Sequence, residues 1–210
     1  MSYKLIIFDF DGTLSDTSPH ILNCGQKCID KFNLRYPTQQ EINSMGGGVF
    51  ANTMMSLGAT EDMITPLKEY YKQIFLEDVS DITLYDGVFD TLMRIKARGI
   101  KLAIATNRGR EILLPLLKHL GILDLFDELV CESDVNNKKP HPEMIDLILN
   151  KLKIPKEDSL IVGDTKYDVL LGKNSNIRTC LVDYSKKGYN DESKPDYVVH
   201  DFKEIVDILK

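Results

Sequence analysis

Two aspartates, Asp9 and Asp11, directly follow a short apolar run near the start of the chain. Their spacing at a strand end predicts that both carboxylates face one site, and like charges this close are costly unless a cation or a proton compensates them. Asp164 adds a third carboxylate after another apolar run. Oxygen ligands of this kind suit Mg²⁺, which proteins hold with one or two carboxylates plus water and substrate phosphate. The sequence therefore predicts a magnesium site.

Other polar side chains follow further apolar runs and complete the predicted chemistry. The compact ammonium of Lys139 can neutralise a nucleophilic carboxylate and a phosphate oxygen together, and the proline that follows it favours Lys139 over Lys138 for this role. Thr106 and Asn107 can donate hydrogen bonds to the same phosphoryl group, aided by backbone N–H groups of the Gly12 loop. These groups together predict a site for phosphoryl transfer.

The elements that must position these groups alternate between strands and helices. Short apolar runs predict strands over residues 3–8, 101–105, 160–162, 179–182 and 197–199, with a weaker candidate over 128–131. Helical spacing of apolar residues predicts helices over 88–98, 110–120 and 142–152. Such alternation implies a parallel sheet covered on both faces, and ligands bind outside the carboxyl ends of its strands. The polar clusters should therefore meet at one edge of the sheet.

One segment interrupts the alternation. Residues 17–79 contain no strong strand signal, and 21–32, 39–45 and 61–75 have helical patterns. We predict an α/β protein with a three-layer, Rossmann-like, doubly wound parallel sheet, and a small all-helical cap domain inserted after the first strand. The predicted boundaries are 1–16 and 82–210 for the core and 17–81 for the cap.

Composition and charge exclude several classes of protein. The 210 residues include 26 basic and 32 acidic side chains, and the net charge of −6 offers no basic surface for nucleic acid. No apolar stretch approaches the roughly 20 residues that span a bilayer, and no signal-peptide pattern is present. The four cysteines lack paired CxxC spacing and suit reduced, buried thiols. We expect a cytoplasmic protein that is a monomer or a weak homodimer.

The polar clusters occur in the order of the signature motifs of the haloacid dehalogenase-like hydrolase superfamily, which the chain resembles over nearly its whole length. The stretch 9–13 is similar to the first motif, Thr106 matches the second and Lys139 the third. The resemblance implies that Asp9 is a nucleophile that becomes an aspartyl phosphate. It implies that Asp11 is the general acid and base.

The fourth motif of that superfamily concerns the metal. Asp164 together with Asp168 resembles this acidic motif. The resemblance implies that Asp164 binds Mg²⁺ directly, and that Asp168 binds it through water or orients a partner. It adds Asp9 and the backbone carbonyl of Asp11 to the metal ligands. The helical insert resembles the mobile cap of the superfamily.

Further pieces, 18–19, 139–142, 187–189 and 195–199, resemble the phosphoglycolate phosphatase-like and β-phosphoglucomutase-like branch. The resemblance implies a magnesium-dependent phosphatase that hydrolyses a small phosphorylated metabolite, such as phosphoglycolate, pyrophosphate or a sugar phosphate. Because pyrophosphatases, phosphatases and mutases of the branch share these pieces, a sugar-phosphate mutase is an alternative. A non-enzymatic phospho-switch is a second alternative, although a switch of that kind needs neither the helical insert nor the acidic motif of Asp164 and Asp168.

Two arginines just past Asn107, Arg108 and Arg110, leave two interpretations open. We interpret them as solvated surface side chains. The alternative is that one of them binds an anionic group of the substrate, because a guanidinium matches phosphate and carboxylate geometry.

Overall fold

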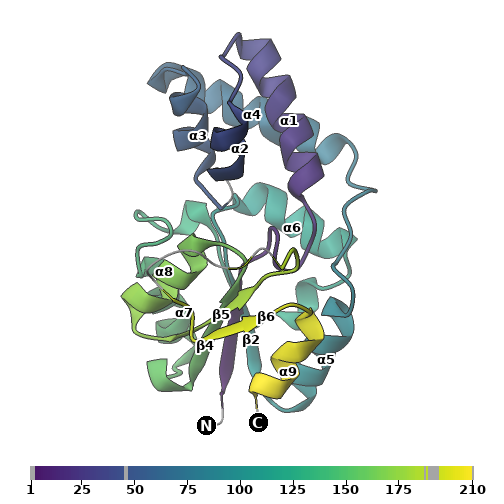
Figure 1. Cartoon of the computed structure of the whole chain (residues 1–210), viewed down its shortest axis with the longest axis vertical. Coiled ribbons are helices and arrows are strands. Elements are labelled where there is room, and N and C mark those ends of the chain that lie inside the picture. Colours follow the sequence, from purple (N-terminus) through teal and green to yellow (C-terminus); the bar gives the residue numbers. More distant parts are fainter. Residues whose placement is uncertain (1–2, 45–46, 187, 189–193, 210) are drawn as a thin grey trace.

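The computed structural model of the chain describes residues 3–44, 47–186, 188 and 194–209 (Figure 1). Met45, the last residue of one predicted helix, lies outside the described residues. So do Lys187 and Tyr189 of the tail that carries part of the resemblance. The remaining predicted elements can all be compared with the structure.

Six parallel strands form a single sheet in the order β3-β2-β1-β4-β5-β6. The strands are β1 Leu5–Phe8, β2 Lys101–Ala105, β3 Glu128–Val130, β4 Ser159–Gly163, β5 Arg178–Val182 and β6 Tyr197–Val199. The order runs outward in both directions from β1 and β4, as in a doubly wound fold. The predicted fold class is confirmed, and the weaker strand candidate is the edge strand β3.

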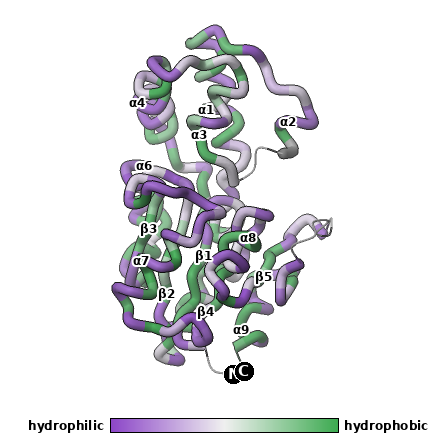
Figure 2. The backbone as a smooth tube through the Cα atoms, turned by 90° about the vertical axis from the view of Figure 1, so that its left-hand side faces the viewer, coloured by the Kyte–Doolittle hydropathy of each residue, from purple (hydrophilic) through white to green (hydrophobic). Residues whose placement is uncertain are grey.

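Helices cover both faces of this sheet because alternate residues of each strand point to opposite faces. Ile6 and Phe8 of β1 pack in the larger core cluster with α5 (Val88–Ala97), α6 (Arg110–His119) and α9 (Ile205–Ile208). Leu5 and Ile7 pack in a second cluster with α7 (Glu143–Leu152) and α8 (Lys166–Ser175). Figure 2 shows the central strands as hydrophobic segments inside more mixed helices. Because both faces of these strands are buried, their sequences are continuous apolar runs.

Four helices, which we call the helical group, lie together beyond the carboxyl ends of the strands (Figure 1). They are α1 Ser18–Phe32, α2 Gln39–Ser44, α3 Phe50–Ser56 and α4 Glu61–Glu77. Cys24, Cys28 and Phe75 of this group are buried in the larger core cluster, which continues through Phe10 and Leu14 into the sheet. Among the described residues, no helix is both long and apolar enough to span a membrane.

Three helices of the described residues, α3, α8 and α9, lie outside the predicted helical segments. Helix α8 contains Gly172, which lowers intrinsic helix propensity. A Cβ at this position would lie 2.2 Å from Thr179 Cγ2, so the glycine lets α8 pack closely against β5. Tertiary packing therefore sets this helix. The short 3₁₀ segments are Leu123–Leu125, Glu132–Asp134, Lys156–Asp158 and Phe202–Glu204.

Candidate active site

The strand register brings the predicted polar clusters to one edge of the sheet. Phe8 at the end of β1 pairs with Ile104 on β2 and with Val162 on β4. The residues that follow these positions, Asp9 and Asp164 among them, therefore leave the sheet at the same level. This edge faces the helical group (Figure 1).

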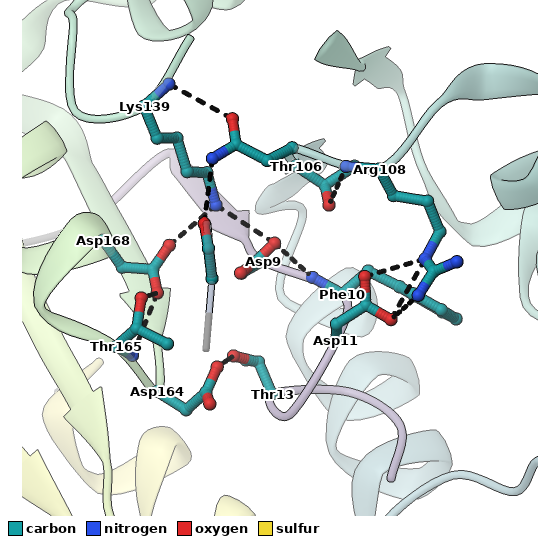
Figure 3. Close-up of polar contacts among 12 residues, drawn as sticks. Asp9, Phe10, Asp11, Thr13, Thr106, Arg108, Lys139, Asp164, Thr165 and Asp168 are labelled. Carbon is teal, nitrogen blue, oxygen red and sulfur yellow. Dashed lines mark hydrogen bonds and ion pairs between the residues drawn. The ribbon is translucent and has the colours of Figure 1, made fainter. Parts of the chain in front are cut away.

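Lys139 lies between two buried carboxylates at this edge (Figure 3). Its Nζ is 3.0 Å from Asp9 Oδ1 and 2.7 Å from Asp168 Oδ1, and the side chain is 2% exposed. Burial alone would lower the pKa of this ammonium, but the two carboxylates outweigh burial and raise it. The backbone N–H of Phe10 donates to Asp9 Oδ1 at 2.8 Å. Lys138, by contrast, points to Glu132, with a side chain that is 28% exposed.

Asp168 is fixed by the start of helix α8. Its Oδ2 accepts hydrogen bonds from the backbone N–H of Thr165 at 3.0 Å and from the Thr165 hydroxyl at 2.7 Å. These bonds belong to a capping box, which satisfies N–H groups at a helix N-terminus. Because its other oxygen accepts from Lys139, Asp168 holds the ammonium in place.

Asp164 lies against the loop that follows β1. The Thr13 hydroxyl donates to Asp164 Oδ1 at 2.8 Å. Gly12 has a φ of 77°, and a Cβ on it would lie 2.3 Å from Asp164 Oδ2. Only glycine meets both requirements without moving the carboxylate. The turn and the acidic side chain are therefore matched to each other.

We expect Gly12→Ala to weaken Mg²⁺ binding about 10- to 100-fold, because the added methyl group displaces Asp164. The left-handed backbone adds a loss of stability of about 1 to 2 kcal/mol. Gly58→Ala is a matched control, since Gly58 has a φ of 102° and a Cβ there would meet nothing within 4 Å. It should lower stability and leave Mg²⁺ binding unchanged. Urea unfolding measures the stability and a Mg²⁺ titration measures the affinity. Equal Mg²⁺ affinities for the two variants would contradict the prediction that Asp164 binds the metal.

The carboxylates at this edge fit a divalent cation. Asp9, Asp164 and Asp168 each offer an oxygen, and these oxygens lie within 4.8 Å of one another. Burial raises the pKa of Asp9 to about 7, although Lys139 acts in the opposite direction. Burial and the charges of Asp168 and Asp9 also raise the pKa of Asp164 well above its usual range. A cation would relieve this excess of negative charge.

In the absence of divalent cations, we expect Asp9 to make the free energy of unfolding fall as the pH rises from about 4 to about 7. The folded protein keeps this proton up to a pKa of about 7, whereas the unfolded chain releases it near 3.8. In that interval the native state binds more protons, so raising the pH favours unfolding. Urea unfolding in EDTA, with Asp9→Asn as the reference, isolates this contribution. A difference between the two proteins that does not change with pH would contradict it.

Thr106 and Asn107 follow β2 and connect this edge to its surroundings. Thr106 is 1% exposed, and its Oγ1 accepts a hydrogen bond from the backbone N–H of Arg108 at 3.1 Å. The hydroxyl proton can therefore be donated to a ligand. The Asn107 side chain accepts a hydrogen bond from the backbone N–H of Lys139 at 3.2 Å and donates one to the Gly47 carbonyl at 2.9 Å. Asn107 thus joins the third predicted motif to the helical group.

Arg108 corrects one interpretation of the sequence, because it is not a solvated surface residue. Its side chain is 5% exposed and forms an ion pair with Asp11, with Nη2 2.6 Å from Oδ1. The strong attraction of a carboxylate for a fork of N–H donors explains why this cation is buried. Arg110 is different: it pairs with Asp134, and its side chain is 37% exposed. The Thr17 hydroxyl also donates to Asp11 Oδ1.

Known proteins share this architecture. A family model described as haloacid dehalogenase-like hydrolase matches residues 6–182. This chain belongs to the haloacid dehalogenase-like hydrolases. The resemblance expected from the motifs is therefore confirmed, and the phosphoglycolate phosphatase-like branch of these hydrolases is supported by similar proteins.

Among such relatives of this hydrolase is the pyrophosphatase PpaX of Oceanobacillus iheyensis. It is 32% identical over 100% of this chain and 98% of the relative. PpaX of Halalkalibacterium halodurans is 30% identical, with the same two coverages. The crystal structure of a predicted phosphoglycolate phosphatase from Haemophilus somnus is 26% identical, with a TM-score of 0.85 over 100% of this chain and 99% of that chain.

Sequence reasoning gave no role to two residues that the structure places in the site of this hydrolase, Thr13 and Thr165, and it interpreted a third, Arg108, as a solvated surface side chain, with binding of a substrate anion as the alternative. The Thr165 to Asp168 spacing is a capping-box signal and was available from the sequence. Thr13 lies inside the first motif, but its partner Asp164 is 151 positions away. Arg108 pairs with a residue 97 positions away, and no spacing rule reveals such a pair.

Proposed function

We propose that this protein is a magnesium-dependent phosphatase that hydrolyses a small phosphorylated metabolite through an aspartyl-phosphate intermediate. The observation that carries the proposal is the buried Lys139 between Asp9 and Asp168, beside the third carboxylate of Asp164. A carboxylate nucleophile next to a fixed ammonium suits attack on a phosphoryl group, whose negative charge must be neutralised. Membership of a hydrolase family supports the same chemistry.

We propose that the carboxylates of Asp9 and Asp164 and the backbone carbonyl of Asp11 hold Mg²⁺. Asp168 either binds it through water or orients Lys139, and the hydrogen bonds to both of its oxygens favour the orienting role. When bound, the ion supplies Lewis-acid stabilisation of charge on the phosphoryl oxygens. The close approach of the Asp9 and Asp164 carboxylate oxygens supports these two members of the ligand set.

The residues divide the reaction into two steps. Asp9 attacks phosphorus in line, the bond to the leaving oxygen breaks, and Asp11 gives that oxygen a proton. Asp11 then takes a proton from water, which attacks the aspartyl phosphate and releases inorganic phosphate and the Asp9 carboxylate. Lys139, Thr106 and Asn107 stabilise the phosphoryl oxygens in both steps, together with N–H groups of the Gly12 loop.

We propose that residues 17–81 are a cap domain on a core formed by 1–16 and 82–210. The position of the helical group over the catalytic edge supports this division (Figure 1). Contacts between the two parts include the hydrogen bond that Asn107 donates to the Gly47 carbonyl at 2.9 Å and the ion pair of Lys68 with Glu132, with Nζ 2.8 Å from Oε1. A cap in this place would exclude bulk water during the reaction.

Pyrophosphate is the first substrate to test, because the PpaX relatives are named pyrophosphatases. The experiment is a phosphate-release screen with Mg²⁺ over pyrophosphate, phosphoglycolate, hexose phosphates and nucleotides. We expect one substrate with kcat/KM at or above about 10⁴ M⁻¹s⁻¹, and loss of activity in EDTA that Mg²⁺ restores. Isomerisation of a sugar phosphate without phosphate release would indicate the mutase reaction instead. Absence of turnover on all substrates would overturn the proposal.

We propose that the protein acts in the cytoplasm on a small molecule, without nucleic acid or membrane, as a monomer or a weak homodimer. The acidic net charge of −6 supports the absence of nucleic acid. Four buried free cysteines support a reducing compartment. Size-exclusion chromatography coupled to light scattering tests the assembly state.

A further inference from the structure

The guanidinium of Arg108 occupies both carboxylate oxygens of Asp11 (Figure 3). Nε lies 2.8 Å from Oδ2, and Nη2 lies 2.6 Å from Oδ1. Paired N–H bonds of this kind are directional and strong. Because both oxygens are engaged, Asp11 has to leave this pair before it can exchange a proton with a substrate.

Helix α4 of the helical group contacts the same guanidinium. The Cζ atom of Arg108 lies 4.5 Å from the centroid of the Phe75 ring. The Tyr71 hydroxyl is a further neighbour. A cation packed against aromatic rings and away from water requires an anionic partner, which in this structure is Asp11. If Arg108 releases Asp11, another anion has to take its place.

The reaction geometry indicates where that anion would be. In-line attack by Asp9 places the leaving group on the far side of phosphorus, where Asp11 must meet the leaving oxygen. Arg108 contacts Asp11 and is therefore beside the leaving group. Lys68 and Lys138, which also approach this edge, both pair with Glu132. Unlike Lys68 and Lys138, Arg108 pairs with a residue of the proposed chemistry, the general acid and base Asp11.

We propose that Arg108 is a specificity-determining residue that exchanges its partner on substrate binding: it releases Asp11 and takes an anionic group of the leaving side of the substrate. The second phosphate of pyrophosphate and the carboxylate of phosphoglycolate have this chemistry. An uncharged leaving side cannot replace Asp11, because the buried guanidinium would lose its counter-charge. The inference rests on the proposed phosphatase function and narrows its substrates to those with an anionic leaving side.

The test compares pyrophosphate with p-nitrophenyl phosphate, in the presence of Mg²⁺, for the full chain and for Arg108→Gln. Both substrates have leaving groups of low basicity, so the need for a proton from Asp11 differs little between them. We expect Arg108→Gln to lower kcat/KM for pyrophosphate about 10- to 100-fold. The value for p-nitrophenyl phosphate should stay the same or rise, because Asp11 is no longer held. Equal losses on both substrates would show that Arg108 only supports the structure, and would overturn the inference.

Two variants and one binding measurement complete the design. Arg108→Lys keeps the charge but loses the fork, so it should keep part of the preference for pyrophosphate and guards against a failure of Arg108→Gln to fold. Arg110→Gln, at the exposed neighbour that pairs with Asp134, should leave kcat/KM unchanged for both substrates.

In the Asp9→Asn background, calorimetric titration should show that Arg108→Gln weakens pyrophosphate binding. Unchanged pyrophosphate binding would overturn the proposal that Arg108 exchanges Asp11 for an anionic group of the substrate. Absence of turnover by the unmodified protein on both substrates would overturn the phosphatase proposal itself.

Discussion

Asp9→Asn is expected to lower phosphate release from every substrate by at least about 10⁴-fold, because an amide cannot form the acyl phosphate. The replacement keeps the shape of a side chain whose residue is only 5% exposed. Its amide oxygen can still accept the hydrogen bond that the Phe10 N–H donates at 2.8 Å to Asp9 Oδ1. The loss should therefore appear in kcat, with the fold intact.

Three readouts separate a lost nucleophile from a damaged site. Circular dichroism should show an unchanged fold, and calorimetry should still detect pyrophosphate binding in the presence of Mg²⁺. Acid quenching of the unmodified protein during turnover should trap a phosphorylated chain, whereas Asp9→Asn should trap none. A variant that keeps more than about a tenth of the normal rate would refute Asp9 as the nucleophile.

The sheet could be predicted from the sequence because its strands are buried on both faces. Such strands appear as uninterrupted apolar runs, of which the all-buried β1 is the clearest. The helices that end in glycine after a basic turn, such as α5, were predicted for a comparable local reason. Helix α3 was not, because it has seven residues and only Met54 among its buried side chains. The packing of Phe50 against Tyr71, with ring centroids 4.7 Å apart, depends on a second helix.

The candidate site shows the same division between local and distant information. Asp9, Thr106 and Asp164 could be placed at one edge because parallel strands end together. The partners of Arg108 could not be placed. The shared edge of β1 and β2 does not indicate which side chains of the two following loops pair, and Phe75 reaches Arg108 only because the helical group lies over the sheet. A basic residue in a short loop is usually solvated, and nothing in its neighbours in sequence indicates a buried ion pair.

Lys139→Met is expected to have the largest effect on stability and a large effect on rate. The ammonium is the cation held between Asp9 and Asp168. Its removal leaves these buried carboxylates facing each other, and breaking a buried ion pair in this way costs about 3 to 5 kcal/mol. Phosphate release should fall by at least about 10³-fold, because the charge on the phosphoryl group loses its fixed partner.

Lys138→Met provides the matched control, because the neighbouring lysine pairs with Glu132 and its side chain is 28% exposed rather than 2%. Its stability should change by less than about 1 kcal/mol, and its activity should be preserved. Urea unfolding in EDTA measures the stability of both variants, and a phosphate-release assay measures their rates. Similar losses for the two lysines would contradict the assignment of Lys139.

A second substitution distinguishes charge from packing as the cause of the Lys139→Met loss. Asp168→Asn removes one of the two carboxylates that Lys139 bridges and leaves an amide oxygen for the Thr165 N–H, which lies 3.0 Å from Asp168 Oδ2. If uncompensated charge is the cause, the double variant should be more stable than Lys139→Met alone. Mg²⁺ should also raise the stability of Lys139→Met more than that of the unmodified protein, since the ion replaces part of the missing positive charge. The rate should not recover in either case, because Lys139 stabilises the phosphoryl oxygens as well as the folded protein.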